Sequence, residues 1–269
     1  MLIKKYHIVF LSLFFSAYLL NGQDKSITTY YDIDSLMIKE TININSENQL
    51  VGSYQSFFTS GGKKVIGFYS NNKPDSLWSY YFENGNLKTN GFLKSGKKRG
   101  IWSHFYENGQ IRMKGEMAGE KRTGKWTFYY ENGKEKSIGI YENNKKENIW
   151  NYFYEDGKLK AQAFYEQGSG EYKELYPSGS LKMEGYNSNQ KSTGKWKYYY
   201  ESGELQAEGV FKLGSKTGIW KYYHKNGIVS ASGNFIEGRK NGLWKYYYAD
   251  GKLRSEGIER DGQKEGFWK

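Results

Sequence analysis

The chain has 269 residues, 18% of them aromatic and 33 of them glycine, with only two prolines and no cysteine. The lack of cysteine excludes disulfides, thiolate zinc sites, cysteine nucleophiles and a lipid-modified N-terminal cysteine. A net charge of +11 and a pI near 9.3 favour anionic partners. The mean hydropathy of -0.85, with so many rings, suits a thin β-structure with half-exposed faces better than a thick apolar core.

Residues 1–22 predict an export signal. Lys4 and Lys5 precede an uncharged, mostly apolar run at residues 8–20, which a polar stretch follows. A membrane span needs about 20 apolar residues, so this shorter run fits the h-region of a secretory signal. Cleavage after Gly22 would place Leu20 where a small residue is expected, so an uncleaved anchor is the alternative. On either interpretation the protein is exported, and is periplasmic, outer-surface or secreted.

Aromatic rings recur along the chain at a spacing of 24 residues. The one longer gap between tryptophans contains Tyr172, which stands 22 residues after Trp150 and 24 before Trp196 and takes a tryptophan position. The ring positions that define the repeat are Trp78, Trp102, Trp126, Trp150, Tyr172, Trp196, Trp220, Trp244 and Trp268. Such a period is typical of a repeat architecture, in which each unit contacts its neighbours.

The repeats are predicted to occupy residues 52–269. The first copy, from Gly52 to Gly67, keeps the spacing but has lost its tryptophan. Residues 23–51 are interpreted as an N-terminal cap or linker, or as a further decayed repeat, because terminal repeats must cover an end that has no neighbour.

Glycines follow the same grid as the rings. One lies seven residues after every ring from Trp78 to Trp244, as Gly133 follows Trp126, and a second lies six further on, with Ala163 as its one substitution. A third stands two residues before the ring, as Gly124 and Gly170 do, and is replaced only by Asn148 and Ser76.

Each unit is predicted to be a β-hairpin. In the unit from Gly124, strand-favouring rings at 126 to 130 lead into Asn132-Gly133, residues that tolerate the positive φ of a tight turn. Glycines at this frequency would break a helix. The fold class is therefore all-β, an elongated antiparallel meander of repeated hairpins. Stacked hairpins should place tryptophan beside tryptophan across the sheet; whether the sheet is open, superhelical or closed is left undecided.

In this form the repeat resembles the MORN-repeat variants of bacterial proteins of the YwqK-family, antitoxin-like kind. The resemblance rests on segments such as GKWTFYYENGKEKSIG, GKWKYYYESGELQAEG and GLWKYYYADGKLRSEG. It covers residues 52–269 and implies an elongated sheet of antiparallel hairpins that associates with proteins or lipids. It transfers no catalytic residue. An export signal departs from the antitoxin-like interpretation, because a toxin neutralised before release is met in the cytoplasm.

The turns before each ring are basic, whereas the turns after it carry acids such as Glu107 and Glu131. In a meander the two kinds of turn lie on opposite long edges, so one rim should be cationic. That rim either keeps the protein soluble or binds an anionic lipid, polysaccharide or protein. The candidate anion-binding residues are Lys97, Lys98, Arg99, Lys121, Arg122, Lys145, Lys146, Arg239 and Lys240.

No catalytic or metal constellation is recognisable. His104 and His224 occupy positions where other units have Tyr or Phe, so they are interpreted as ring substitutes, and no histidine pair has metal spacing. We expect no enzyme activity, no cofactor and no metal. The expected function is an exported scaffold that binds a protein or envelope component; the alternatives are an antitoxin-like partner or an anionic lipid or glycan binder. Nucleic acid is not expected because of export, and the oligomeric state is left open.

Overall fold

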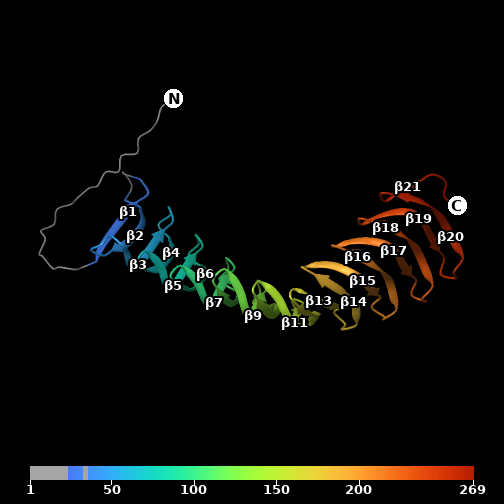
Figure 1. Cartoon of the computed structure of the whole chain (residues 1–269), viewed down its shortest axis with the longest axis horizontal. Helices are drawn as coiled ribbons and strands as arrows, with labels where there is room; N and C mark the ends of the chain where they lie inside the picture. Colours follow the sequence, from blue (N-terminus) through green and yellow to red (C-terminus); the bar gives the residue numbers. More distant parts are fainter. Residues whose placement is uncertain (1–23, 33–35) are drawn as a thin grey trace, which may run out of the picture.

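The computed structural model describes residues 24–32 and 36–269, which form one open sheet of 21 strands with no helix among them. Every strand pairs antiparallel with its neighbours in sequence, so β1 and β21 are the edges (Figure 1). The ribbon is long, curved and twisted, and its two ends stay apart. The predicted all-β meander is confirmed, and the sheet is open.

The strands have the following bounds: β1 Lys25–Tyr30, β2 Ile38–Ile44, β3 Leu50–Phe57, β4 Lys63–Ser70, β5 Lys73–Tyr81, β6 Leu87–Lys94, β7 Lys97–Phe105, β8 Ile111–Ala118, β9 Lys121–Tyr129, β10 Glu135–Glu142, β11 Lys145–Phe153, β12 Leu159–Glu166, β13 Ser169–Leu175, β14 Leu181–Ser188, β15 Lys191–Tyr199, β16 Leu205–Lys212, β17 Ser215–Tyr223, β18 Val229–Ile236, β19 Arg239–Tyr247, β20 Leu253–Arg260 and β21 Gln263–Glu265. The predicted export signal at residues 1–22 lies outside the described residues. Within residues 23–51, β1 and β2 form a hairpin that joins the sheet through β3.

The chain reverses at Asn132-Gly133 as predicted, in a three-residue loop. The backbone N–H of Tyr130 donates to Lys134 O at 2.9 Å, and that of Gly133 donates to Tyr130 O at 3.0 Å, which closes a loop of three residues. Of Asn132 and Gly133, only Gly133 has a positive φ, of 82°. This is the three-residue hairpin with a left-handed glycine, whereas a two-residue type I′ turn would need positive φ at both of its residues.

Two-residue turns occur instead at the opposite edge of the sheet, before each ring-bearing strand. Asn143 and Asn144 have φ values of 49° and 70°, the signature of a type I′ turn. Glycine adopts this conformation at low cost because it has no Cβ atom. Asparagine does so because its short polar side chain can hydrogen-bond locally. The same pair of positive φ values is found at Asn71-Asn72, Ser95-Gly96, Gln167-Gly168, Asn189-Gln190, Leu213-Gly214, Glu237-Gly238 and Asp261-Gly262.

A bulge in each ring-bearing strand explains the glycine two residues before the ring. Between β10 and β11, Ile138 pairs with Asn151 but Ile140 pairs with Glu147, so β11 carries two extra residues. The residue within the bulge, Asn148, has a φ of 57°. The same position has a φ between 60° and 84° in the other bulged units, at Gly52, Ser76, Gly100, Gly124, Gly194, Gly218 and Gly242. Glycine recurs there because L side chains disfavour this conformation.

The unit around Tyr172 lacks the bulge, and this accounts for its shorter spacing. The register between β12 and β13 is unbroken from Ala161 to Glu166. The two residues missing from the 24-residue period are therefore the two that form the bulge elsewhere. Gly170 stands two residues before Tyr172 as predicted, but unlike the bulge glycines it has no positive φ; a Cβ there would overlap the carbonyl of Phe164.

The core is a single row of rings along one face of the sheet, here called the aromatic face. The prediction that tryptophan lies beside tryptophan is wrong, because a glycine on the strand between them separates the two. Gly139 on β10 pairs with Trp126 on β9, and the ring of Trp150, on the next strand β11, covers Gly139. Four tryptophans, Trp150, Trp220, Trp244 and Trp268, instead contact the ring two residues after the preceding tryptophan, as Trp150 contacts Phe128 at 6.2 Å between centroids. Such ring pairs stabilise by about 0.5–1.5 kcal/mol each.

Candidate binding surfaces

The predicted cationic rim divides into two sets of side chains. Four of the predicted residues are the first of a ring-bearing strand and are exposed at the edge formed by the tight turns; these are Lys97, Lys121, Lys145 and Arg239, and Arg99 on β7 is exposed too. The acidic loops that include Glu107 and Glu131 lie at the other long edge and are exposed as well. These cations are free to meet an anionic partner.

The second residue of the strand turns onto the aromatic face and covers a tryptophan. The Nζ atom of Lys146 lies 4.4 Å from the Trp150 ring centroid, and that of Lys240 lies 4.3 Å from Trp244. Lys98 and Arg122 contact Trp102 and Trp126 in the same way, at 5.2 and 4.8 Å. These four predicted rim residues therefore belong to the core as cation–π partners.

Burial changes the acid–base behaviour of these cations. Desolvation lowers the pKa of Lys146 to about 8 and also lowers that of Lys216, to which the charge of Lys240 contributes. Each ammonium donates to a tyrosine hydroxyl, Lys146 to Tyr152 at 2.7 Å and Lys216 to Tyr222 at 2.9 Å. Burial in turn raises the pKa of Tyr152, so this hydroxyl stays protonated at neutral pH.

Counter-ions are present for only part of this row of cations. Lys240 lies 3.7 Å from the buried carboxylate of Glu259, and Lys98 lies 3.3 Å from the exposed carboxylate of Glu120. Glu259 stands fifteen residues after Trp244, where the preceding unit has Phe235. Lys216 accordingly contacts the Phe235 ring, at 5.2 Å, instead of a carboxylate.

The opposite face carries a row of exposed apolar side chains that the sequence reasoning did not single out. The residue before each tryptophan points away from the aromatic face, because side chains alternate along a strand. Ile149 is 53% exposed and Ile219 is 61% exposed, although β11 and β17 each have a neighbouring strand on both sides. We call this surface the aliphatic face, defined by Leu77, Phe92, Ile101, Ile149, Phe164, Ile219, Leu243 and Ile258.

The aliphatic face is hollowed where the bulge is missing. Ile149, Leu159, Phe164 and Leu175 line a depression of about 250 Å³ over β11 to β13. The alternation of strand residues was the signal for this row: where an apolar residue directly precedes a tryptophan, the two side chains must lie on opposite faces of the sheet. Lys125, Glu171 and Lys195 interrupt the row at the same repeat position.

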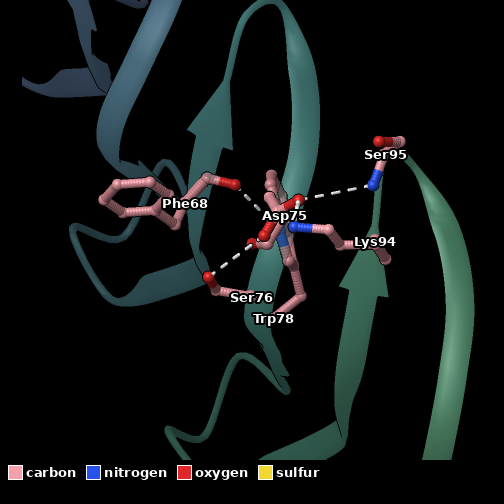
Figure 2. Close-up of polar contacts among 6 residues, drawn as sticks. All are labelled: Phe68, Asp75, Ser76, Trp78, Lys94 and Ser95. Carbon is pink, nitrogen blue, oxygen red and sulfur yellow. Dashed lines mark hydrogen bonds and ion pairs between the residues drawn. The ribbon is translucent and has the colours of Figure 1, made fainter.

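Hydrogen bonds tie each ring-bearing strand to its neighbours, and Figure 2 shows them for Trp78. Its indole N–H donates to Phe68 O at 3.2 Å, next to the bulge, and to Asp75 O at 3.0 Å. The Asp75 carboxylate accepts from Ser95 N and pairs with Lys94 at 3.2 Å. The hydrogen bond from Lys94 holds the pKa of Asp75 below its usual value.

Both histidines in the described residues are packed within the repeat. His224 Nε2 lies 3.0 Å from Tyr247 O, the contact that a tyrosine hydroxyl makes in other units. His104 lies 3.0 Å from Thr89 Oγ1, whose single proton goes to Ser103 O, so His104 Nδ1 carries the hydrogen. Over residues 24–32 and 36–269, no group of three or more potential metal ligands occurs. No helix in this part of the chain is long and apolar enough to cross a membrane.

An open sheet of equivalent hairpins, each packed only on its neighbours, defines a β-repeat protein. Six of its segments match the MORN repeat variant family, at residues 98–117, 122–143, 146–167, 192–213, 216–237 and 240–258. The six matched segments are hairpins of the sheet and are similar to MORN repeats of the variant type. The short unit around Tyr172 falls between two of the matched segments. No curated protein matches the chain.

Proposed function

We propose that this protein is an exported, non-enzymatic repeat scaffold that binds a partner protein along its aliphatic face. The observation that carries the proposal is the row of exposed apolar residues, which recurs from Leu77 to Ile258. Extended apolar surfaces of this kind mark interaction sites on soluble proteins. The export component rests on residues 1–22 and is tested by fractionation and by sequencing the N-terminus of the mature protein.

The partner that suits this face is a protein with apolar side chains flanked by charges of both signs. The apolar row runs beside lysine–glutamate pairs on the same face, such as Lys245 with Glu256 at 3.1 Å and Lys173 with Glu184 at 4.0 Å. A surface of alternating charge favours a protein with complementary ion pairs over a uniformly anionic membrane.

The test uses substitutions that the repeat itself tolerates. Lys125 and Lys195 occupy the position of Ile101, Ile149 and Ile219 in other units, so changing these three isoleucines together to lysine should preserve the fold. The wild-type protein should retain one stoichiometric protein from envelope fractions, and the triple variant should lose it while keeping its melting temperature. A partner that the triple variant retains with wild-type affinity would contradict the proposal.

The exposed rim cations favour a second function, binding of an anionic lipid or glycan. Lys97, Lys121, Lys145 and Arg239 are exposed along one edge. Changing these four residues together to glutamine should abolish salt-sensitive binding to anionic vesicles or acidic polysaccharide, because exposed charges are screened by salt. If the quadruple variant still bound the vesicles, the rim would be excluded as the lipid-binding site.

An antitoxin-like role is the finer proposal that the YwqK-like segments suggest. In that case the partner on the aliphatic face is a toxin. Co-expression with a toxin encoded beside this gene should then restore growth, and the triple lysine variant should fail to do so.

A further inference from the structure

A hollow of about 410 Å³ lies on the aromatic face between β15 and β18. Ala207, a small residue that pairs with both Tyr198 and Tyr222, lines this hollow. At the same repeat position other units have alanine, at Ala161 and Ala231, or methionine, at Met113 and Met183, whose longer side chain would fill this space. The volume lies within the usual range for a small-ligand site, about 300–1,000 Å³.

The polar groups around the hollow have free hydrogen-bonding capacity. The Lys216 ammonium makes one hydrogen bond, to Tyr222, and within the described chain it has no carboxylate at ion-pair distance. Gln206 and Ser230, which also line the hollow, have no side-chain hydrogen bond to any residue that the structure describes, and the same is true of the Tyr198 hydroxyl. A cation, an amide and two hydroxyls therefore converge on one open space.

This set of groups has a specific chemical complement. An unpaired ammonium in a partly desolvated site favours an anionic group, because no protein charge neutralises it. The amide and the two hydroxyls can both donate and accept, which suits ligand hydroxyls. The rings of Tyr198 and Tyr222 stand on either side, as broad apolar surfaces with polar tips. A carboxylate, several hydroxyls and an apolar ring face occur together in an acidic sugar.

We propose that this hollow binds the carboxylate-bearing sugar unit of an acidic oligosaccharide, with Lys216 pairing the carboxylate and Gln206, Ser230 and Tyr198 contacting ring hydroxyls. The site is separate from the exposed rim cations. It lies on the opposite side of the sheet from the aliphatic face, so it does not depend on the partner protein proposed above.

The test is titration calorimetry of the full chain with a galacturonic acid trisaccharide, compared with a neutral galactose trisaccharide and with inorganic phosphate. The acidic trisaccharide should bind, the neutral one should bind at least tenfold more weakly, and phosphate should not compete at equal concentration. A charge-assisted hydrogen bond of about 1.5–3 kcal/mol corresponds to this tenfold loss or more. Equal binding of the neutral sugar, or full competition by phosphate, would overturn the acidic-sugar assignment.

Two variants locate the site. Lys216→Gln removes the charge, and Ala207→Met fills the hollow with the side chain found at Met113 and Met183; each should reduce binding at least tenfold while the melting curve stays cooperative. Lys146→Gln is the matched control, because Lys146 has the same repeat position but does not border this hollow. Unchanged binding by Ala207→Met, or equal losses for Lys146→Gln and Lys216→Gln, would refute the proposal. Ala207→Met keeps every polar group, so its result stands even if Lys216→Gln folds poorly.

Discussion

The indole of Trp150 lies directly over the Cα atom of Gly139, on the neighbouring strand. A Cβ built on Gly139 would overlap the Cγ, Cδ2 and Cε2 atoms of that ring. The same overlap recurs from Gly67 under Trp78 to Gly257 under Trp268. The glycine six residues after the loop glycine is therefore required by packing, since it makes room for the next tryptophan.

We expect Gly139→Ala to destabilise the protein by about 1–3 kcal/mol, the usual cost of overpacking a core. The alanine must displace Trp150, which is only 1% exposed and contacts Tyr141 at 4.9 Å. Denaturant unfolding, followed by tryptophan fluorescence, measures the change.

The short unit provides the control for that substitution. Ala163 stands where other units have glycine, and its partner on β13 is Tyr172 instead of tryptophan. Ala163→Gly should therefore cost less than Gly139→Ala, and the double variant Gly139→Ala with Trp150→Tyr should lose less stability than the sum of its single changes. Strict additivity would show that the ring and the glycine are not coupled.

Ser76 is the one bulge residue that is neither glycine nor asparagine, and its φ is 63°. This conformation costs an L residue about 1–2 kcal/mol relative to glycine. Ser76→Gly should raise the unfolding free energy by about 1 kcal/mol, less a small loss from its 3.4 Å contact with Asp75. The reverse change Gly100→Ser should lower it, and melting temperatures of the two variants check both signs. A drop in stability for Ser76→Gly would refute strain at this position.

The sequence spacing sufficed to predict the hairpins, because loop glycines and ring positions repeat with the period of the strands themselves. Lys145 and Lys146 were predicted together as rim residues because both precede Trp150 in a basic turn. Strand alternation counted back from Trp150 places Lys146 on the aromatic face, and the bulge at Asn148 leaves this unchanged because it adds two residues. At Gly170 the spacing does not reveal the role of the residue, because a glycine required by close backbone approach looks the same in sequence as one required by positive φ.

A tyrosine hydroxyl joins successive units along the edge formed by the longer loops. Tyr154 donates to Leu175 O at 2.8 Å, and Tyr130 donates to Phe153 O at 2.7 Å. Tyr154→Phe should cost about 1 kcal/mol, the net value of one hydrogen bond. Tyr248 has the same repeat position without a hydroxyl partner in the described chain and is 55% exposed, so Tyr248→Phe should leave the melting temperature unchanged. Equal effects of the two substitutions would contradict the inter-unit role of Tyr154.

His104 interrupts the row of rings and should make the protein sensitive to acid. Desolvation, with contributions from the charges of Arg112, Lys98 and Arg122, lowers its pKa from 6.5 to about 4. Between these two values the unfolded chain binds a proton that the folded protein does not, so the unfolding free energy falls as the pH drops from 6.5 toward 4.

His104→Phe, which places at this position the ring found at Phe128, should remove this component. Wild-type protein should lose more of its melting temperature between pH 7 and pH 5 than the variant does, at constant ionic strength. The carboxylates common to both proteins contribute equally to the two curves, so the difference isolates the histidine. Parallel curves would show that His104 is protonated in the folded protein as readily as in the unfolded chain, and hence that the ring is not desolvated by its neighbours.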